Sequence, residues 1–536
     1  MTSPVSSRPS DCAWGAFDDV APWVLDPNNI SWEKQAIELR VSAQREVPVL
    51  TTPTRIPPVA RLVVVVWVLS KALVPWFVKK KLRPFATPED SRAYISLRMR
   101  KAVERLGSTY IKLGQIISSG EGLFPAELVN EFKLCRDQVP AIPFESVKKT
   151  IESELGKPLT EVFSYIDTTA LAAASIAQVH LATLITGEEV VVKVQRPTVS
   201  KMVRKDLRVM AWLAPHLVGR IKVSALANPP ALVELFAETI VEELDFRIEA
   251  SNMLDVAKML CELNQDRYII PRPHPTLATQ RVLVMQRLSG FKFDDVVGMK
   301  NAGIDTHAVI RTGMIAFMEG AMIYGVFHGD LHGGNLFVMP DGRTALLDFG
   351  IVGRLSGARR MAFLRLMLNA TTNNVVGQVE ALRDLGALPM DTDIQAVIKD
   401  LNLGDAAIDP TTLSGEELVK EVQRIVKALM GYGARMPKEL MLYVKNMVFL
   451  DGAIARLAPE LDILAEIASI SMLFAERHGE RLGRELGVDH TAIEINLDSV
   501  KTGVLGVDAS VNSLTYRDLQ ARRELIQKRM RDHVGR

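Results

Sequence analysis

Residues 325–355 of the 536-residue chain read GVFHGDLHGGNLFVMPDGRTALLDFGIVGRL, and they are its most informative part. Two short apolar runs, LFV and TALL, flank an Asp341-Gly342 turn signal, which is typical of a β-hairpin. Asn335 stands just before the first run and Asp348 just after the second. Because the two strands of a hairpin are antiparallel, we expect it to bring these two polar residues side by side.

The block matches, in order and in spacing, two motifs of the protein-kinase catalytic core, H-R-D-L-x-x-x-N and D-F-G. The matching residues are His328, Asp330, Leu331 and Asn335, then Asp348, Phe349 and Gly350. Gly329 stands where a protein kinase has Arg. Each motif alone is short, but both in this order with a hairpin between them are a specific signal. The sequence therefore predicts an ATP site with a divalent metal.

The residue types in this block fit phosphoryl transfer, which needs positioning and charge neutralisation more than covalent chemistry. Asn335 and Asp348 are the expected metal ligands, because amide and carboxylate oxygens suit hard Mg²⁺, or Mn²⁺ in its place. Asp330 is the expected catalytic residue, since its carboxylate can orient a hydroxyl or a water and take up its proton. ATP and Mg²⁺ are thus the expected cofactors.

A kinase-like site also requires a lysine on an earlier strand, and EEVVVKVQ at 188–195 supplies Lys193. An unpaired ammonium is costly to bury among valines, which favours a phosphate-binding role over a structural one. Its partner is expected on a helix downstream. The candidates in VEELDFRIEA are Glu242, Glu243, Asp245 and Glu249.

Two departures separate the chain from ordinary protein kinases. In place of a glycine-rich phosphate loop, residues 171–180 read LAAASIAQVH. Alanine cannot follow every backbone path open to glycine, so this loop must have another shape. An A-P-E motif does not follow D-F-G closely. The tripeptide at 458–460 lies well downstream, and we expect it to begin a helix with Pro459 at the first position.

With these departures the chain resembles the UbiB-type atypical kinases, also called AarF-domain-containing kinases, from about Arg98 to at least Arg354. GSTYIKLGQIIS at 107–118 matches the K-x-G-Q motif, LAAASIAQVH the alanine-rich loop, and EELDFRIEA the E-x-D motif. The resemblance implies nucleotide-binding roles for Lys112, Gln115, Ala172, Ala173, Ala174, Ser175, Lys193 and Met285. It implies that Glu249 pairs with Lys193 and acts in catalysis, and that Glu243 and Asp245 are regulatory.

The resemblance also implies an α+β fold, bilobal and protein-kinase-like, mostly helical, with an N-terminal helical extension packed over the active site. Lys112 and Gln115, three apart on a helix, would share one face and point into the nucleotide site. The implied activity is that of an ATPase or atypical kinase rather than ordinary protein phosphorylation. The implied setting is isoprenoid quinone biosynthesis or other lipid metabolism at membranes.

The sequence departs from this family in places. SSGEGLFP follows the K-x-G-Q helix where an Arg-Pro-Asp stretch is more common, and the hinge-like MQRLSG has no acidic residue after Met285. Many members end in transmembrane helices, whereas the end of this sequence is charged. Two alternatives therefore stay open, a nucleotide-gated lipid- or small-molecule-binding module with little turnover, and a small-molecule phosphotransferase.

Composition limits the partners. A formal net charge of +1 gives no global attraction to nucleic acid. The three cysteines form no CxxC pair, so neither a zinc site nor a disulfide framework is expected, and a reducing cytoplasmic location fits. An unknown lipid or small molecule is the expected substrate.

The longest apolar run, LVVVVWVLSKALVPWFV at 62–78, is interrupted by Lys71 and Pro75 and closed by three lysines at 79–81. A buried helix is the favoured interpretation, because the run is short for a bilayer span, and an interfacial helix in peripheral membrane contact is the alternative.

Changes of pattern along the chain predict six segments. They are a loosely ordered extension at 1–60 with one helix around Trp32 to Arg45, an apolar and basic helix at 61–90, the helical K-x-G-Q region at 91–160, a kinase-like N-lobe at 161–290, a C-lobe at 291–480 and a charged helical tail at 481–536.

Overall fold

The computed structural model describes residues 30, 32–118, 125–135, 140–218, 228–372, 374–401, 429, 431–435, 437–487 and 513–534. Helices make up 62% of the structure, and the sheets are mixed, as expected for a mostly helical kinase-like domain. The first 29 residues, most of SSGEGLFP, and parts of the predicted C-lobe and tail lie outside the described residues.

The chain forms two compact units, which are described separately. The first consists of Met1–Lys292 with Gly333–Val352, and the second of Phe293–His332 with Gly353–Arg536. Residues 325–355 are therefore divided between the two units. Asp330 belongs to the second unit, while Asn335 and Asp348 belong to the first.

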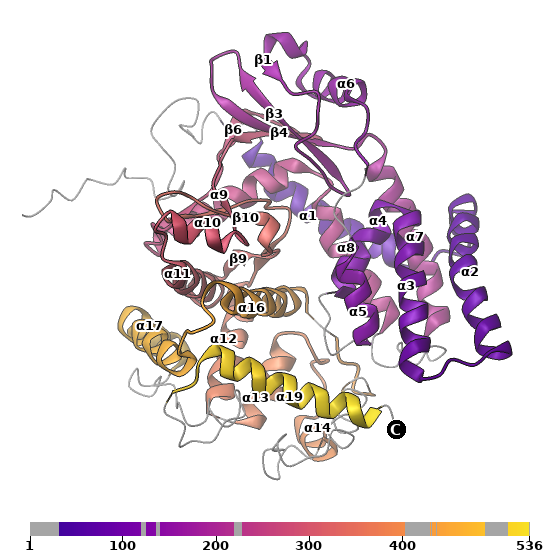
Figure 1. The fold of residues 1–536 in the computed structure, drawn as a ribbon, viewed down its shortest axis with the longest axis vertical. Coiled ribbons are helices and arrows are strands. Elements are labelled where there is room, and N and C mark those ends of the chain that lie inside the picture. Colours follow the sequence, from indigo (N-terminus) through magenta and orange to yellow (C-terminus); the bar gives the residue numbers. More distant parts are fainter. Residues whose placement is uncertain are drawn as a thin grey trace, which may run out of the picture. The chain divides into compact units, whose positions relative to one another are not determined.

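The first unit contains a six-stranded antiparallel sheet (Figure 1). The strand order is β1-β3-β4-β7-β6, and β2 pairs with β3. The strands are β1 Phe163–Ile166, β2 Ala172–Ala173, β3 Ala177–Leu184, β4 Glu189–Gln195, β6 Pro273–Ala278 and β7 Val282–Gln286. The turn before β4 has Gly187 at φ +100°, a conformation that favours glycine.

Lys193 lies on the central strand β4, opposite Val179 of β3 and Leu283 of β7. Helix α6 (Phe144–Leu155) packs with the alternate β4 residues Val190, Val192 and Val194, all fully buried. Because successive strand residues point to opposite faces, Lys193 points away from α6.

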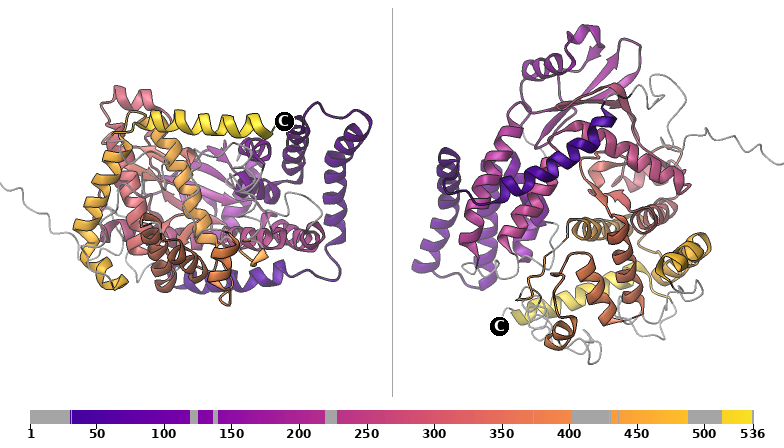
Figure 2. Two further views of the ribbon diagram at one scale, coloured as in Figure 1. Left: turned by 90° about the horizontal axis from the view of Figure 1, so that it is seen from below. Right: turned by 180° about the vertical axis from the view of Figure 1, so that it is seen from behind.

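A helical layer forms the other core of this unit. Its members are α1 Glu33–Thr51, α2 Val59–Leu82, α3 Pro88–Leu106, α4 Ser108–Ser118, α5 Ala126–Lys133, α7 Val199–Leu217, α8 Pro229–Glu242 and α9 Phe246–Glu262. Helix α1 packs on α7, α8 and α9 (Figure 2). The helix expected around Trp32 to Arg45 is thus longer than predicted, and it belongs to the packed core rather than to a loosely ordered extension, because its residues at 36, 43, 47 and 50 are buried.

The apolar run forms α2, but the favoured interpretation of a buried helix is wrong. Only Val65, Val68 and Ala72 of this helix are buried, whereas most of its other large apolar side chains are exposed. Among the described residues, α2 is the one helix that is long and apolar enough to cross a membrane by length and composition. Periodicity could not separate the two cases, because the run is apolar on every side.

A second sheet of the first unit has the order β5-β11-β10-β8. Its strands are β5 Tyr268–Ile269, β8 Phe291–Lys292, β10 Leu336–Val338 and β11 Thr344–Leu346. Strands β10 and β11 form the predicted hairpin, with Gly342 in the turn at φ +84°. The hairpin closes where the amide of Leu347 donates to the carbonyl of Asn335 at 2.9 Å, next to Asp348. The predicted juxtaposition is confirmed.

The described part of the second unit is largely helical. Its elements are α10 Val296–Asn301, α11 Thr306–Glu319, a π-helical turn Gly320–Tyr324, β9 Val326–His328, α12 Gly357–Thr371, α13 Val375–Asp384, α14 Ile394–Asp400, α16 Lys438–Leu457, α17 Ile463–Leu486 and α19 Tyr516–Val534. Strand β12 (Val352–Arg354) pairs with β9. The expectation that Pro459 begins a helix is wrong, since α16 ends at Leu457 and α17 begins after its cap, Asp462.

Candidate functional site

Lys193 lies between two carboxylates. Its Nζ is 2.7 Å from Oε1 of Glu249 and 3.2 Å from Oδ1 of Asp348. The side chains of Lys193 and Glu249 are 12% and 5% exposed, whereas that of Asp348 is 48% exposed. Of the four acidic candidates on the downstream segment, the structure selects Glu249. The lysine, its helical partner and the aspartate of the D-F-G motif therefore form one cluster in the first unit.

Burial shapes the charges in this cluster. Desolvation raises the pKa of Glu249 to about 7, because it outweighs the pull of the Lys193 ammonium. Desolvation also opposes the charge of Lys193, but the carboxylates of Asp348 and Glu249 together outweigh it and raise the pKa of Lys193. The lysine is therefore firmly cationic, as a phosphate-binding group must be.

Asp348 has a strained backbone, with φ at +55°. That region is unfavourable for residues other than glycine, and such strain is concentrated at functional sites. Its Oδ1 accepts a hydrogen bond from the amide of Gly350 at 3.1 Å. The half-exposed carboxylate is thus held in one place and remains accessible to a ligand.

A divalent metal fits the donors at this place. Asn335 ends a short 3₁₀ turn, Gly333–Asn335, and is buried, and the hairpin bonds its carbonyl to the amide of Leu347, the residue before Asp348. Among the described residues no group of three or more His, Cys, Asp or Glu side chains could hold a metal. One carboxylate and one amide oxygen would leave the remaining positions to phosphate oxygens and water, as Mg²⁺ commonly has them.

Lys112 of the K-x-G-Q helix α4 pairs with Glu243 at 2.9 Å, and both side chains are largely buried. Glu243 also lies beside the D-F-G motif. A Cβ built on Gly350 would be 3.4 Å from Cγ of Glu243 and 3.2 Å from Oδ1 of Asp348. The structure therefore brings the K-x-G-Q and E-x-D motifs to the D-F-G motif, and it leaves no spare room at position 350.

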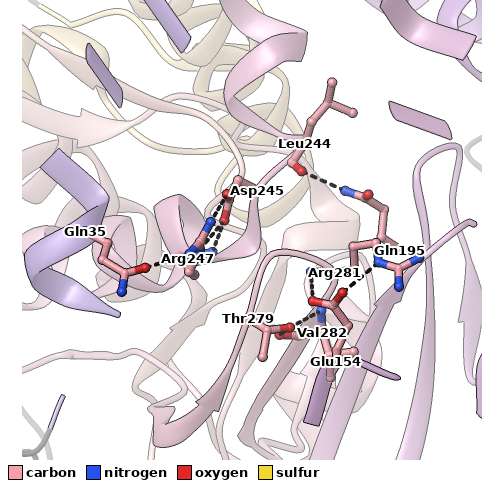
Figure 3. A network of polar contacts seen from close by, with 9 residues as sticks. All are labelled: Gln35, Glu154, Gln195, Leu244, Asp245, Arg247, Thr279, Arg281 and Val282. Carbon is pink, nitrogen blue, oxygen red and sulfur yellow. Dashed lines mark hydrogen bonds and ion pairs between the residues drawn. The ribbon is translucent and has the colours of Figure 1, made fainter. Parts of the chain in front are cut away.

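Asp245, the second acidic residue of E-x-D, holds the start of a helix. It is the N-cap of α9, accepts from the amide of Arg247 at 3.1 Å and pairs with the Arg247 guanidinium at 2.7 Å (Figure 3). The guanidinium also donates to Gln35 of α1. Next to Asp245, the carbonyl of Leu244 accepts from Gln195 of β4 at 3.1 Å. These contacts fix the start of the helix that carries Glu249.

The alanine-rich loop is a tight extension of the sheet. Ala172 and Ala173 form β2, and the amide of Ala174 donates to the carbonyl of Ala177 at 2.9 Å. Ser175 is buried. The carbonyl of Ala174 accepts from Nε of Arg196 at 3.1 Å. Sequence reasoning missed this arginine, which stands at the end of EEVVVKVQR.

Two further predicted nucleotide contacts lie in the same unit. Met285 is half-buried on β7, opposite Val191. Gln115 is half-buried on α4, one turn after Lys112. Between them in the motif, Gly114 packs closely, since a Cβ there would be 3.4 Å from Sγ of Cys135. The structure brings α4 close to α5 through this glycine.

In the second unit, Asp330 has a partner that no motif indicated. Its carboxylate pairs with Lys445 of α16, and both side chains are mostly buried. The next residue, Asn446, is fully buried, accepts from the amide of Leu331 at 3.0 Å and donates to the carbonyl of His328. A lysine beside an asparagine in an ordinary helical pattern carries no signal that could have identified these contacts.

Comparisons with known proteins identify the family. A family profile described as "ABC1 atypical kinase-like domain" matches residues 134–382. An uncharacterised aarF domain-containing protein kinase of Arabidopsis thaliana, named as chloroplastic, is 32% identical, over 69% of this chain and 73% of its own. An uncharacterised protein of Mycobacterium tuberculosis is 34% identical, over 67% and 74%. A probable protein kinase UbiB of Marinobacter nauticus is 30% identical, over 73% and 70%. The chain belongs to the ABC1/AarF family of atypical kinase-like proteins, which includes the UbiB type.

Proposed function

We propose that the protein binds ATP with a divalent metal and transfers its terminal phosphoryl group to water or to a small-molecule or lipid acceptor. The cluster of Lys193, Glu249 and Asp348 is the observation that carries this proposal. A lysine kept cationic and held by one buried carboxylate has the arrangement needed to bind phosphate oxygens. The half-exposed carboxylate beside it can face a metal.

The proposed roles follow from the contacts. Lys193, held by Glu249, binds the phosphates, and Asn335 and Asp348 hold Mg²⁺ or Mn²⁺, which would neutralise charge on the phosphate oxygens. Asp330 orients the accepting hydroxyl or water. Ala172, Ala173, Ala174, Ser175 and Met285 contact the nucleotide.

The proposal includes a bilobal kinase-like fold. The N-terminal helices would cover the site, with Lys112 and Gln115 on the nucleotide side. The closeness of Glu243 to the Cβ position of Gly350 supports this, because the partner of Lys112 then lies near Asp348. A cover of this kind leaves little room for a protein substrate, which favours an ATPase or an enzyme of small acceptors.

The Lys112–Glu243 pair also favours a second candidate function, a nucleotide-gated binding module with little turnover. A buried Lys112–Glu243 pair next to the D-F-G motif could link nucleotide binding to movement of the K-x-G-Q helix. Glu243 and Asp245 would then be regulatory. This candidate predicts tight nucleotide binding whose affinity changes when a lipid or another small ligand binds.

Helix α2 supports a peripheral membrane location on the cytoplasmic side. Its exposed apolar residues include Val63, Trp67, Val74 and Phe77, and Lys79 to Lys81 end the helix. An apolar face next to lysines suits the surface of an anionic bilayer. In this setting the acceptor or ligand would be an isoprenoid quinone intermediate or another lipid.

The test is ATP turnover by the full chain with and without Mg²⁺. We expect Asp348→Asn to abolish Mg²⁺-dependent turnover, because the exposed carboxylate is lost, while Asp391→Asn, an exposed control, keeps it. Turnover that survives Asp348→Asn would overturn the proposal. Tight nucleotide binding without turnover in the wild type would favour the binding module. Lipid profiling of a deletion strain, complemented by wild type or by Asp348→Asn, would identify the acceptor class.

A further inference from the structure

Arg40 connects helix α1 to helix α9. Its Nη2 lies 2.8 Å from Oγ of Ser251, 2.9 Å from Oδ1 of Asn252 and 3.0 Å from Oδ2 of Asp255. The side chain of Arg40 is 17% exposed. A guanidinium this well buried with three acceptors on one helix is more than a surface ion pair.

Asn252 carries the contact onward. It is 3% exposed, and its Nδ2 donates to the backbone carbonyl of Phe349 at 2.8 Å. A guanidinium can only donate, so the amide oxygen of Asn252 must face Arg40. The nitrogen of the amide must then face Phe349. Arg40 therefore determines which way round the Asn252 amide stands.

The carbonyl at the end of this chain of contacts belongs to the residue after Asp348. Asp348 has a positive φ and a half-exposed carboxylate, so its position depends on how the neighbouring backbone is held. Phe349 is fully buried. Asn252 also stands three residues after Glu249, on the same face of α9. One turn of α9 thus contacts both Lys193 and the D-F-G backbone.

We propose that Arg40 is a positioning residue for the metal-binding carboxylate of Asp348, acting through Asn252 and the carbonyl of Phe349. The inference rests on the proposed function, because it assumes that Asp348 holds the metal. It assigns a role at the site to a helix that lies outside the matched residues 134–382.

Other contacts hold α1 in place, so Arg40 can be tested without losing the helix. Trp32 is 1% exposed and donates to the carbonyl of His274 at 3.4 Å. Gln35 accepts from Arg247 at 2.6 Å (Figure 3). Buried side chains of α1 at 36, 43, 47 and 50 pack in the helical core.

The experiment measures how ATP turnover depends on Mg²⁺ concentration. Loss of a contact behind a metal ligand typically weakens metal affinity by 10–100-fold, so Arg40→Met should raise the Mg²⁺ concentration for half-maximal turnover by about tenfold. Its KM for ATP at saturating Mg²⁺ should change little. Arg40→Lys should raise this Mg²⁺ concentration less than Arg40→Met does, since an ammonium can still donate to Asn252. The matched control is Arg45→Met, an exposed arginine of the same helix, which should behave as wild type.

A second variant separates positioning from folding. In Asn252→Asp the side chain still accepts from Arg40 but has no N–H for the Phe349 carbonyl, so the same Mg²⁺ shift is expected even though the contact with Arg40 is kept. If Arg40→Met lowers only the melting temperature and leaves the Mg²⁺ dependence as it was, the inference is overturned.

Hydrogen exchange distinguishes failure of this inference from failure of the proposed function. Without nucleotide, Arg40→Met should speed exchange of the Gly350 amide, which donates to Asp348. Unchanged exchange would contradict the inference, whatever the turnover. Faster exchange in a protein whose wild type shows no Mg²⁺-dependent turnover would overturn the proposed function and leave the positioning role supported.

Discussion

The ammonium of Lys112 lies 2.9 Å from the carboxylate of Glu243, and the two side chains are 15% and 11% exposed. Removing one member would leave a poorly solvated charge without this counter-ion, which costs about 3 kcal/mol or more. We therefore expect Lys112→Met to lower the free energy of unfolding by roughly that amount. The double variant, Lys112→Met with Glu243→Gln, should have most of the wild-type stability. Urea unfolding measures both.

The control for this pair is Lys101→Met, which removes an exposed lysine from the neighbouring helix α3 and should change stability by less than about 0.5 kcal/mol. Equal stability losses in the single and double variants would show that the two charges are not coupled.

The pH dependence of stability should report Glu249. Its pKa is raised from 4.5 to about 7 by burial, so the folded state binds a proton that the unfolded state releases. The resulting stability is complete below about pH 4.5 and is lost as the pH rises through about 7. The free energy of unfolding of the wild type should therefore fall, relative to Glu249→Gln, by on the order of 1–3 kcal/mol over this interval. Denaturation without metal or nucleotide measures it, and parallel curves would contradict the assignment.

Asn446 should be required for the structure around Asp330. Two buried backbone groups, the Leu331 amide and the His328 carbonyl, depend on it, and each unsatisfied group costs about 1–3 kcal/mol. We expect Asn446→Ala to destabilise the protein by about 2–4 kcal/mol. The exposed Asn301→Ala is the control, and a loss no larger than the control's would refute the role.

Lys445 should matter for turnover more than for stability. Because its ammonium pairs with Asp330, Lys445→Met should lower kcat by at least about tenfold, while Lys445→Arg should keep a measurable part of it. Lys438→Met, at the start of the same helix, should leave kcat near the wild-type value. Steady-state kinetics decides, and a change in KM alone would argue against a catalytic role for the Asp330 carboxylate.

Helix α2 should bind anionic vesicles. Each lysine near a negatively charged surface contributes about 1 kcal/mol, so Lys80→Gln with Lys81→Gln should weaken partitioning by about 30-fold. Sedimentation with vesicles containing phosphatidylserine measures this, with uncharged vesicles as the second arm. The matched control, Lys148→Gln with Lys149→Gln on α6, should bind as wild type. Equal binding of both double variants would exclude α2 as the contact.

The hairpin and its polar ends were predictable because turn chemistry and strand alternation are local. The position of Lys193 on a central strand was predictable for the same reason. That Glu249, rather than Glu242 or Glu243, pairs with Lys193 was known only through the family resemblance. The four acidic residues are spread over the end of α8, the junction and the first turn of α9, so their side chains differ in direction, and only packing decides which one faces the strand.

What the sequence could not indicate depends on contacts between distant segments. Arg40 and Asn252 are 212 positions apart, and Asp330 and Lys445 are 115 apart. Neither pair has a characteristic spacing, and arginine or lysine on a helix is usually solvated. The exposure of α2 was missed for a related reason, because burial of a helix with apolar residues on all sides depends on whether partners cover it.

The position of Asn446 beyond the matched domain has a consequence for truncated forms of the gene. The matched domain ends at residue 382, yet the backbone around Asp330 depends on an amide that the gene encodes 64 codons later. A premature stop between the two would spare every recognisable motif while removing the partner of the Leu331 amide. A motif search would find every motif in such a truncated allele, but we expect its product to have lost the proposed ATP turnover. The part of the gene that the proposed site needs is thus longer than the stretch by which the family is recognised.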